Sequence, residues 1–301
     1  MKRTLLALAT AAIVTATVAA QAPQPSQTAP EAATVTAVAN ALGMLRGLQL
    51  RDAILTVEYY ATGSQRVFGQ ASRPGAPLPT LKLTSYKASI AYDAPGMRVE
   101  LERTNPEGIV QGGGGLPLNA PQKQILVFSG KHAWNESEPG AGLLPSVGTA
   151  TPAMAAWADR YLEFWMLPHA FVKAARLPNA NTRVTSEAGT AVITTNVPEM
   201  PGVTMKAWLN AKNLIDRVES RLSNTVLGDT IVEARYSGYK DLGGEENPSD
   251  ILFPGHIIRT IGGQPVLDIV ISKGNTYNPY VIVPVPENVM KAASQTAAPT
   301  P

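Results

Sequence analysis

Residues 214–224 read Leu-Ile-Asp-Arg-Val-Glu-Ser-Arg-Leu-Ser-Asn, and this stretch decides the fold class. From Arg217 to Leu222, charged side chains alternate with Val, Ser and Leu, so successive residues point to opposite faces of an extended chain. One face is charged and the other is largely apolar, as in an antiparallel sheet with one face in water. The stretch therefore predicts a strand of an antiparallel sheet.

Similar segments on both sides extend this prediction to most of the chain. They are rich in β-branched and aromatic residues, and turn sequences such as Pro95-Gly96 separate them. Gly262-Gly263 suits a tight hairpin turn, because glycine adopts the positive φ angles that such turns need. Strands are predicted at 53–60, 80–93, 97–103, 124–128, 191–197, 203–210, 214–224, 229–239, 256–261 and 266–272.

Other stretches have helical periodicity. Apolar residues recur at intervals of three and four from Val35 to Leu45, which predicts one helix. Thr151-Pro152 is expected to start a second, because threonine caps free N–H groups and proline suits the first helical position. This helix should reach about Met166, where Leu167-Pro168 interrupts it, and a short helix should follow over 169–175. The predicted fold class is α+β and mostly antiparallel β, an open curved sheet packed on two helical segments.

The N-terminal segment has the sequence of a secretory signal peptide. Lys2 and Arg3 precede an apolar stretch from Leu5 to Ala20, and Ala20-Gln21-Ala22 is typical of a cleavage site. No apolar run in the mature chain reaches the length that spans a bilayer, so we expect a periplasmic or secreted protein without a transmembrane segment. The predicted organisation is a signal peptide at 1–22, a disordered leader at 23–30, a single β-rich domain at 31–288 and a disordered tail at 289–301.

The net charge and the cysteine content exclude several kinds of partner and site. Removing Lys2 and Arg3 from the 25 basic residues leaves 23, which equals the 23 acidic residues. A mature chain without net charge offers no basic surface for nucleic acid, so we expect no nucleic-acid partner. The chain has no cysteine, which excludes disulfides, thiolate metal sites and acylation of an N-terminal cysteine.

Several groups of residues together resemble one family. They are the run Val226-Leu-Gly-Asp-Thr-Ile-Val-Glu-Ala-Arg-Tyr-Ser-Gly-Tyr-Lys-Asp-Leu-Gly-Gly244, then Phe253-Pro254, Gly262–Asp268 and Val285-Pro286, and earlier Tyr60-x-x-Gly63, Phe68-Gly-Gln70, Ser85-Tyr86 and Leu167–Ala175. With these residues, most of the mature chain resembles the N-terminal domain that precedes a metallo-β-lactamase domain in exported bacterial proteins. The resemblance implies a half-barrel like that of LolA/LolB-type lipoprotein carriers, with an apolar cavity between sheet and helices. The hydrolase domain is expected to be absent, because the chain contains no His-x-His-x-Asp-His motif.

The sequence contains no recognisable catalytic or cofactor motif. His132, His169 and His256 lie in different predicted elements, and no pair has the spacing of metal ligands. No Gly-x-Ser-x-Gly motif is present, and the Gly112–Gly115 run lacks the Lys-Ser/Thr of a phosphate-binding loop. We therefore predict no catalytic residues, no metal, no cofactor and a non-catalytic binding role.

Aromatic residues are the candidate ligand-binding residues. Trp157, Tyr161, Phe164 and Trp165 recur at helical spacing on the second predicted helix, and Trp208 lies in the meander. One interpretation is ordinary core packing. The other is the wall of an apolar pocket on the concave side of the sheet.

Two functions from different classes remain open. The first is a carrier or sensor of a lipid-like or other hydrophobic ligand, which requires an apolar cavity between sheet and helices. The alternative is a protein-interaction module that partners a separately encoded envelope protein or hydrolase, which requires an exposed apolar patch. An enzyme with a site that no motif reveals is a third, residual interpretation.

Overall fold

The structure is a computed structural model. It describes residues 28–49, 51–71, 73, 76–108, 112–113, 115–144, 146–224, 227–244, 248–276 and 281–296. The predicted signal peptide lies outside the described residues, as do most of the predicted leader and the end of the predicted tail.

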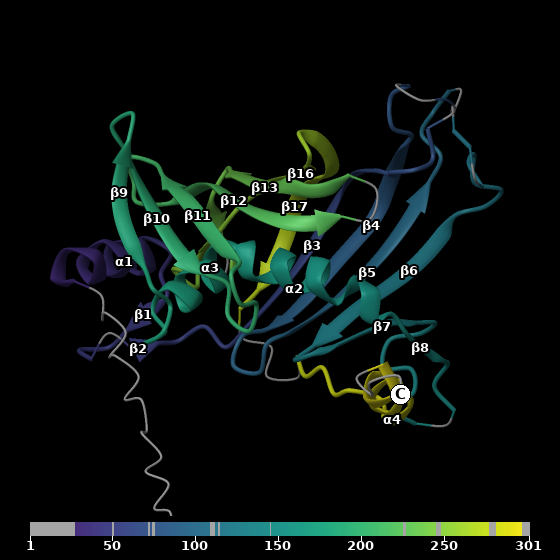
Figure 1. Ribbon diagram of the computed structural model, residues 1–301, viewed down its shortest axis with the longest axis horizontal. Helices are drawn as coiled ribbons and strands as arrows, with labels where there is room; N and C mark the ends of the chain where they lie inside the picture. The colour runs from purple at the N-terminus through teal and green to yellow at the C-terminus, as the bar shows by residue number, and fades with distance from the viewer. Residues whose placement is uncertain are drawn as a thin grey trace, which may run out of the picture.

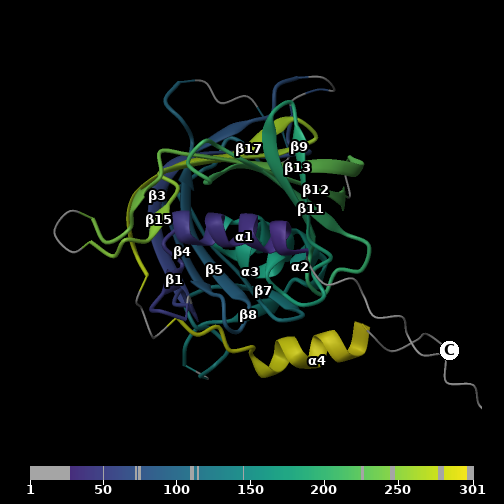
Figure 2. The ribbon, with the colours of Figure 1, turned by 90° about the vertical axis from the view of Figure 1, so that its left-hand side faces the viewer.

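One antiparallel sheet dominates the fold. Its 13 strands follow the order β8-β7-β6-β5-β4-β3-β17-β16-β13-β12-β11-β10-β9, so β8 and β9 are both edges and the sheet does not close on itself. Figures 1 and 2 show the sheet curving into a half-barrel around helices. The strands are β3 (Thr56–Arg66), β4 (Thr80–Ala91), β5 (Gly96–Thr104), β6 (Gln122–Ser129), β7 (His132–Glu136), β8 (Ala150–Pro152), β9 (Arg183–Glu187), β10 (Thr190–Asn196), β11 (Thr204–Leu209), β12 (Ile215–Asn224), β13 (Gly228–Ser237), β16 (His256–Ile261) and β17 (Gln264–Asn275).

The alternating pattern in β12 has the predicted consequence. Val218 and Ser220 are buried on the concave side, and Val218 pairs in register with Ala207 of β11 and Ala234 of β13, both buried. Arg221 is exposed on the convex side. The predicted fold class, a mostly antiparallel open curved sheet packed on helices, is confirmed.

Most of the helices occupy the concave side and one end of the half-barrel, and the last one lies outside it. The chain forms α1 (Ala29–Ala41), a 3₁₀ turn (Met154–Ala156), α2 (Trp157–Met166), α3 (Pro168–Ala175) and α4 (Glu287–Thr296). Figure 1 shows α2 and α3 inside the curve of the sheet, and Figure 2 shows α1 across one end of it. Two short hairpins, β1 (Leu45–Arg46) with β2 (Arg51–Asp52) and β14 (Lys240–Asp241) with β15 (Leu252–Phe253), lie outside the main sheet.

The break between α2 and α3 agrees with the prediction, but the start of α2 does not. Leu167 is extended with a ψ of 142°, as expected for a residue before proline, and α3 starts at Pro168. The predicted start at Thr151-Pro152 is wrong, because Ala150–Pro152 forms the edge strand β8, in which Thr151 pairs with Asn135. Proline is tolerated in an edge strand, where its missing N–H costs no ladder hydrogen bond.

The first and last helices lie partly in segments predicted as disordered. Helix α1 begins at Ala29, inside the predicted leader, and α4 covers Glu287–Thr296, inside the predicted tail. Val289 of α4 packs with Trp134 in a small core on the convex side, and the Asn288 amide donates to the Ala150 carbonyl oxygen at 2.7 Å. These tertiary contacts hold the helix against the sheet.

Strand β3 continues past the predicted end at residue 60, through Gly63 to Arg66. Gly63 pairs with Ile269 of β17, and a Cβ atom at this position would collide with the carbonyl oxygen of Asp268. The glycine therefore permits a close approach of two strands and does not end one. Among the described residues, no helix combines the length and apolar character needed to cross a bilayer.

Candidate functional site

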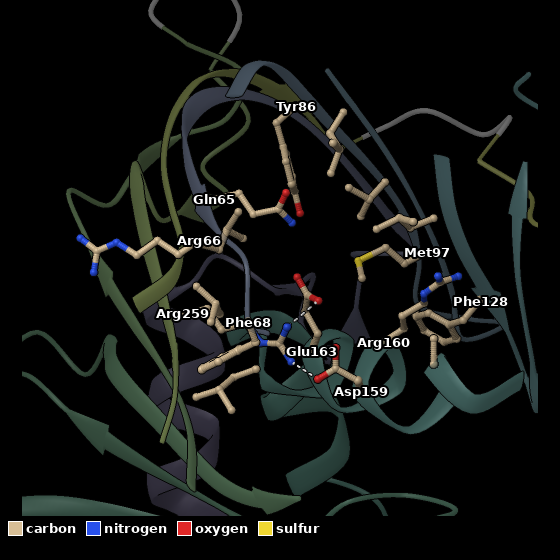
Figure 3. A pocket seen from close by; sticks show the side chains of 17 residues that line it. Gln65, Arg66, Phe68, Tyr86, Met97, Phe128, Asp159, Arg160, Glu163 and Arg259 are labelled. Carbon is tan, nitrogen blue, oxygen red and sulfur yellow. Dashed lines mark hydrogen bonds and ion pairs between the residues drawn. The ribbon is translucent and has the colours of Figure 1, made fainter. Parts of the chain in front are cut away.

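A cavity of about 290 Å³ lies between helix α2 and the concave face of the sheet. Figure 3 shows side chains from the sheet and from α2 pointing into it. We call it the concave cavity. Its lining residues are Gln65, Arg66, Phe68, Tyr86, Met97, Val99, Leu101, Leu126, Phe128, Ala156, Asp159, Arg160, Glu163, Arg259, Ile261, Val266 and Leu267.

Strand alternation builds the apolar wall of this cavity. Met97, Val99 and Leu101 occupy every second position of β5 and therefore share its concave face. Leu126 and Phe128 extend the wall onto β6, where each is opposite a β5 residue of the same face. A ligand in this cavity would contact mostly aliphatic and aromatic surface on the sheet side.

The helix side of the cavity carries a charged cluster. Asp159 and Glu163 are four residues apart on α2, so both lie on the helix face that points to β16. The guanidinium of Arg259 on β16 donates to Asp159 Oδ1 at 2.7 Å and to Glu163 Oε2 at 3.1 Å, as the dashed lines in Figure 3 mark. The Arg259 side chain is 9% exposed, whereas Asp159 is 44% exposed and Glu163 23%. Arg259 thus lies behind the two carboxylates.

Burial determines the ionisation of this cluster. Desolvation raises the pKa of Glu163, against the opposite effect of Arg259, and Asp159 raises it further. Desolvation also disfavours the charged form of Arg259, but Asp159 and Glu163 outweigh it and hold the Arg259 pKa above its ordinary value. Arg259 is therefore the central member of the cluster, because its removal would leave Glu163, which is mostly buried, without its hydrogen-bonded partner.

Other polar groups complete the lining. Arg160 donates to the carbonyl oxygens of Val127 and Trp134, at 2.9 and 2.6 Å, and to Asn135, so its guanidinium points toward the sheet edge. Figure 3 shows Tyr86 reaching into the cavity from the sheet, beside Gln65. A molecule bound here would meet an apolar wall on one side and hydrogen-bonding groups on the other.

The structure separates the aromatic residues that the sequence singled out. Phe164 has no exposed surface and packs edge-on against Phe128 at 5.4 Å, so it belongs to the core. Tyr161 and Trp165 lie on a different side of α2, where they line a second pocket of about 700 Å³. We call this the aromatic pocket. Trp157 stacks on Tyr161 at 4.8 Å and donates to the Gly130 carbonyl oxygen.

Trp208 lies on a different part of the protein from these residues. It lies between Arg217 and Lys206, 3.6 and 5.1 Å from its ring centre, and donates to Glu187 at 3.2 Å. Its strand neighbours Ala207 and Leu209 are buried, so alternation places Trp208 on the convex face. It is not brought together with the α2 aromatics.

The charged cluster was missed by the sequence analysis. The spacing of Asp159 and Glu163 on a helix was a usable signal, since residues four apart share a face. No local pattern points to Arg259 as their partner, because it is about 100 residues away in the chain.

The structure places His169 and His256 in different surroundings. His256 Nε2 lies 2.7 Å from Asp268 Oδ1 between two strands. His169 is fully buried, with its ring stacked on Phe253 at 5.5 Å. Neither of its ring nitrogens has a hydrogen bond of ordinary geometry, although the backbone groups of Leu42 and Leu252 weakly favour the charged form. Among the described residues, no group of three or more His, Cys, Asp or Glu is arranged to hold a metal ion.

His169 is expected to make the protein sensitive to acid. Burial, followed by the charge of Lys173, lowers its pKa from 6.5 to about 4. The unfolded chain therefore takes up a proton before the folded chain does, and stability falls as the pH drops from 6.5 to about 4. The loss from this group is about 3 kcal/mol. Urea unfolding across this range should show a flatter pH dependence for His169→Leu than for the wild type, and equal slopes would contradict this origin.

Comparisons with known proteins give a likeness in structure but none in sequence. No protein-family model matches the chain, and no curated protein matches its sequence. The crystal structure of a "putative outer membrane lipoprotein-sorting protein domain" from Vibrio parahaemolyticus is similar, with a TM-score of 0.36 and 9% identity over 88% of this chain and 98% of that chain. The resemblance to domains that precede a metallo-β-lactamase stays a prediction. The function is therefore inferred from the residues of this chain.

Proposed function

We propose that the protein is an exported, non-catalytic carrier or sensor that holds an amphipathic, lipid-like molecule in the concave cavity. The observation that carries this proposal is the concave cavity itself. It has an apolar wall on the sheet side and the charged cluster of Arg259, Asp159 and Glu163 on the helix side. Small-molecule sites are usually concave, mostly apolar and equipped with a few polar groups that set orientation. The signal-peptide sequence supports a periplasmic or secreted location.

The lining favours one orientation of the ligand. The apolar part would lie along Met97, Val99 and Leu101, where burial of hydrocarbon gains about 0.8 kcal/mol per methylene group. A polar group would lie beside Tyr86 and Gln65 and above Arg259, where hydrogen-bonding groups already face the cavity. Water that enters the cavity without a ligand would solvate the carboxylates of Asp159 and Glu163.

Filling the cavity tests the proposal. Val99→Trp places a large side chain on the apolar wall, and we expect it to abolish binding of a fluorescent fatty-acid probe that the wild type binds. Because the new ring enters existing space, the stability cost should stay within about 1–3 kcal/mol. Fluorescence titration gives the affinity, and circular dichroism verifies the fold. Val99→Phe should give a partial loss.

A matched control lies on the opposite face of the same sheet. Val270 of β17 is 57% exposed, between the buried residues Ile269 and Ile271, so Val270→Trp adds the same ring outside the cavity. It should bind the probe as the wild type does. If Val99→Trp and Val270→Trp bind equally well, or if the wild type binds no apolar probe, the carrier function is wrong and a protein-interaction module takes its place.

A further inference from the structure

The aromatic pocket is larger than the concave cavity and lies on another side of helix α2. It is about 700 Å³ in volume, against about 290 Å³. The turns between β4 and β5, β6 and β7, and β10 and β11 surround it, together with α2 and α3. No residue lines both spaces, so a ligand in one does not occupy the other.

One wall of the aromatic pocket consists of rings held in place by the core. Tyr161 and Trp165 are four residues apart on α2, and their rings meet edge-on at 6.0 Å. Tyr92 packs against Phe164 at 5.6 Å. Such rings offer a flat, rigid and apolar surface, which suits a planar ring system in a ligand.

Two residues of this wall have buried hydrogen-bond donors. The indole Nε1 of Trp165 and the hydroxyl of Tyr92 are buried without a hydrogen bond of ordinary geometry among the described residues, although Trp165 interacts weakly with the Tyr161 hydroxyl. Both side chains line the pocket, and the two residues are 5% and 4% exposed. Because these two atoms have almost no accessible surface, a ligand in the pocket would contact the rings of Trp165 and Tyr92 and not the two donors.

Two lysines on the rim of the aromatic pocket are held in ion pairs, and an arginine on the rim is left to bind a ligand. Lys173 binds Asp52 at 2.6 Å, and Lys131 binds Glu199 at 3.3 Å across the rim. Arg176 ends α3, and its side chain is exposed and forms no hydrogen bond or ion pair among the residues that the structure describes. Its guanidinium can donate two parallel hydrogen bonds to a sulfonate, carboxylate or phosphate. Asp93 also lines the pocket, and its negative charge would weaken the attraction between the pocket and an anionic ligand.

We propose that the aromatic pocket is a second binding site, for a planar, apolar molecule that carries one anionic group. The ring system would lie against Tyr161 and Trp165, and the anionic group would bind Arg176. This site is independent of the proposed function, because its residues do not contact the concave cavity.

A pair of dyes that differ by one anionic group tests the site. 8-Anilinonaphthalene-1-sulfonate and the uncharged N-phenyl-1-naphthylamine share the same rings, so their affinities isolate the contribution of the sulfonate. We expect Arg176→Gln to weaken sulfonate-dye binding about tenfold, as for the loss of one charge-assisted hydrogen bond, and to leave the uncharged dye unaffected. The control Arg221→Gln removes an exposed arginine from the convex face and should change neither affinity.

The Val99→Trp variant distinguishes this site from the concave cavity. It should bind the sulfonate dye as the wild type does even where fatty-acid binding is lost. The second site is wrong if the wild type does not bind the sulfonate dye or if Arg176→Gln and Arg221→Gln bind it equally. It is also wrong if Val99→Trp abolishes its binding, because the dye would then occupy the concave cavity.

Discussion

Replacement of Arg259 by methionine should lower the free energy of unfolding by about 3–5 kcal/mol. Arg259 is the hydrogen-bonded ion-pair partner of both Asp159 and Glu163, and its side chain is 9% exposed. Methionine preserves much of the apolar volume but removes the hydrogen-bonded counter-charge of Glu163. Urea unfolding at neutral pH measures the loss.

The double variant Arg259→Met with Glu163→Leu is the control. It removes the charge that the single variant leaves unpaired, so it should recover more than half of the lost stability. The deficit of the single variant should also shrink at low pH. Burial already raises the pKa of Glu163, and loss of Arg259 raises it further, so protonation relieves the unpaired charge as the pH falls through that pKa. A loss below about 1 kcal/mol, typical of an exposed ion pair, would contradict the structural role.

Truncation of Phe164 to alanine should cost about 3–5 kcal/mol. Its ring has no exposed surface and contacts Tyr92, Phe128 and Trp165 at ring-centre distances of 5.6, 5.4 and 4.9 Å. The substitution leaves a void that this packed environment can fill only partly. Chemical denaturation gives the magnitude of the stability loss. The folded variant should keep its affinity for both the fatty-acid probe and the sulfonate dye.

Trp165→Ala is the matched comparison on the next residue of the same helix. Its ring faces the aromatic pocket, so part of its surface lacks protein contacts and the loss of stability should be smaller. The same substitution should weaken binding of the sulfonate dye. If both variants lose equal stability and neither affects the dye, the aromatic pocket has no binding role for Trp165.

The sheet could be predicted from sequence because its strands are locally encoded. Segments such as 214–224 and 256–261 carry alternation or β-branched runs between turn residues, and the structure has strands there. The edge strands β8 and β9, and β7 beside the first of them, were not predicted. They are three to five residues long, too short to carry a periodic pattern, and β8 depends on pairing with β7.

The candidate sites were less accessible to sequence reasoning. The helical spacing of Tyr161, Phe164 and Trp165 predicts shared faces, but it does not tell which face meets the core and which meets a pocket. Phe164 is in the core because Tyr92, just after β4, and Phe128 of β6 pack against it, and both lie far from it in the chain. The pairing of Arg259 with Asp159 likewise depends on how the sheet curves over α2, which no local pattern encodes.

Native mass spectrometry tests the central claim, ligand binding in the concave cavity, most directly. The wild type and Val99→Trp would be produced in the native host, purified identically and sprayed under gentle conditions. The account predicts that the wild type carries the added mass of a small apolar molecule, which dissociates on activation, and that Val99→Trp carries none. A wild type without added mass, or the same added mass on both proteins, would contradict it.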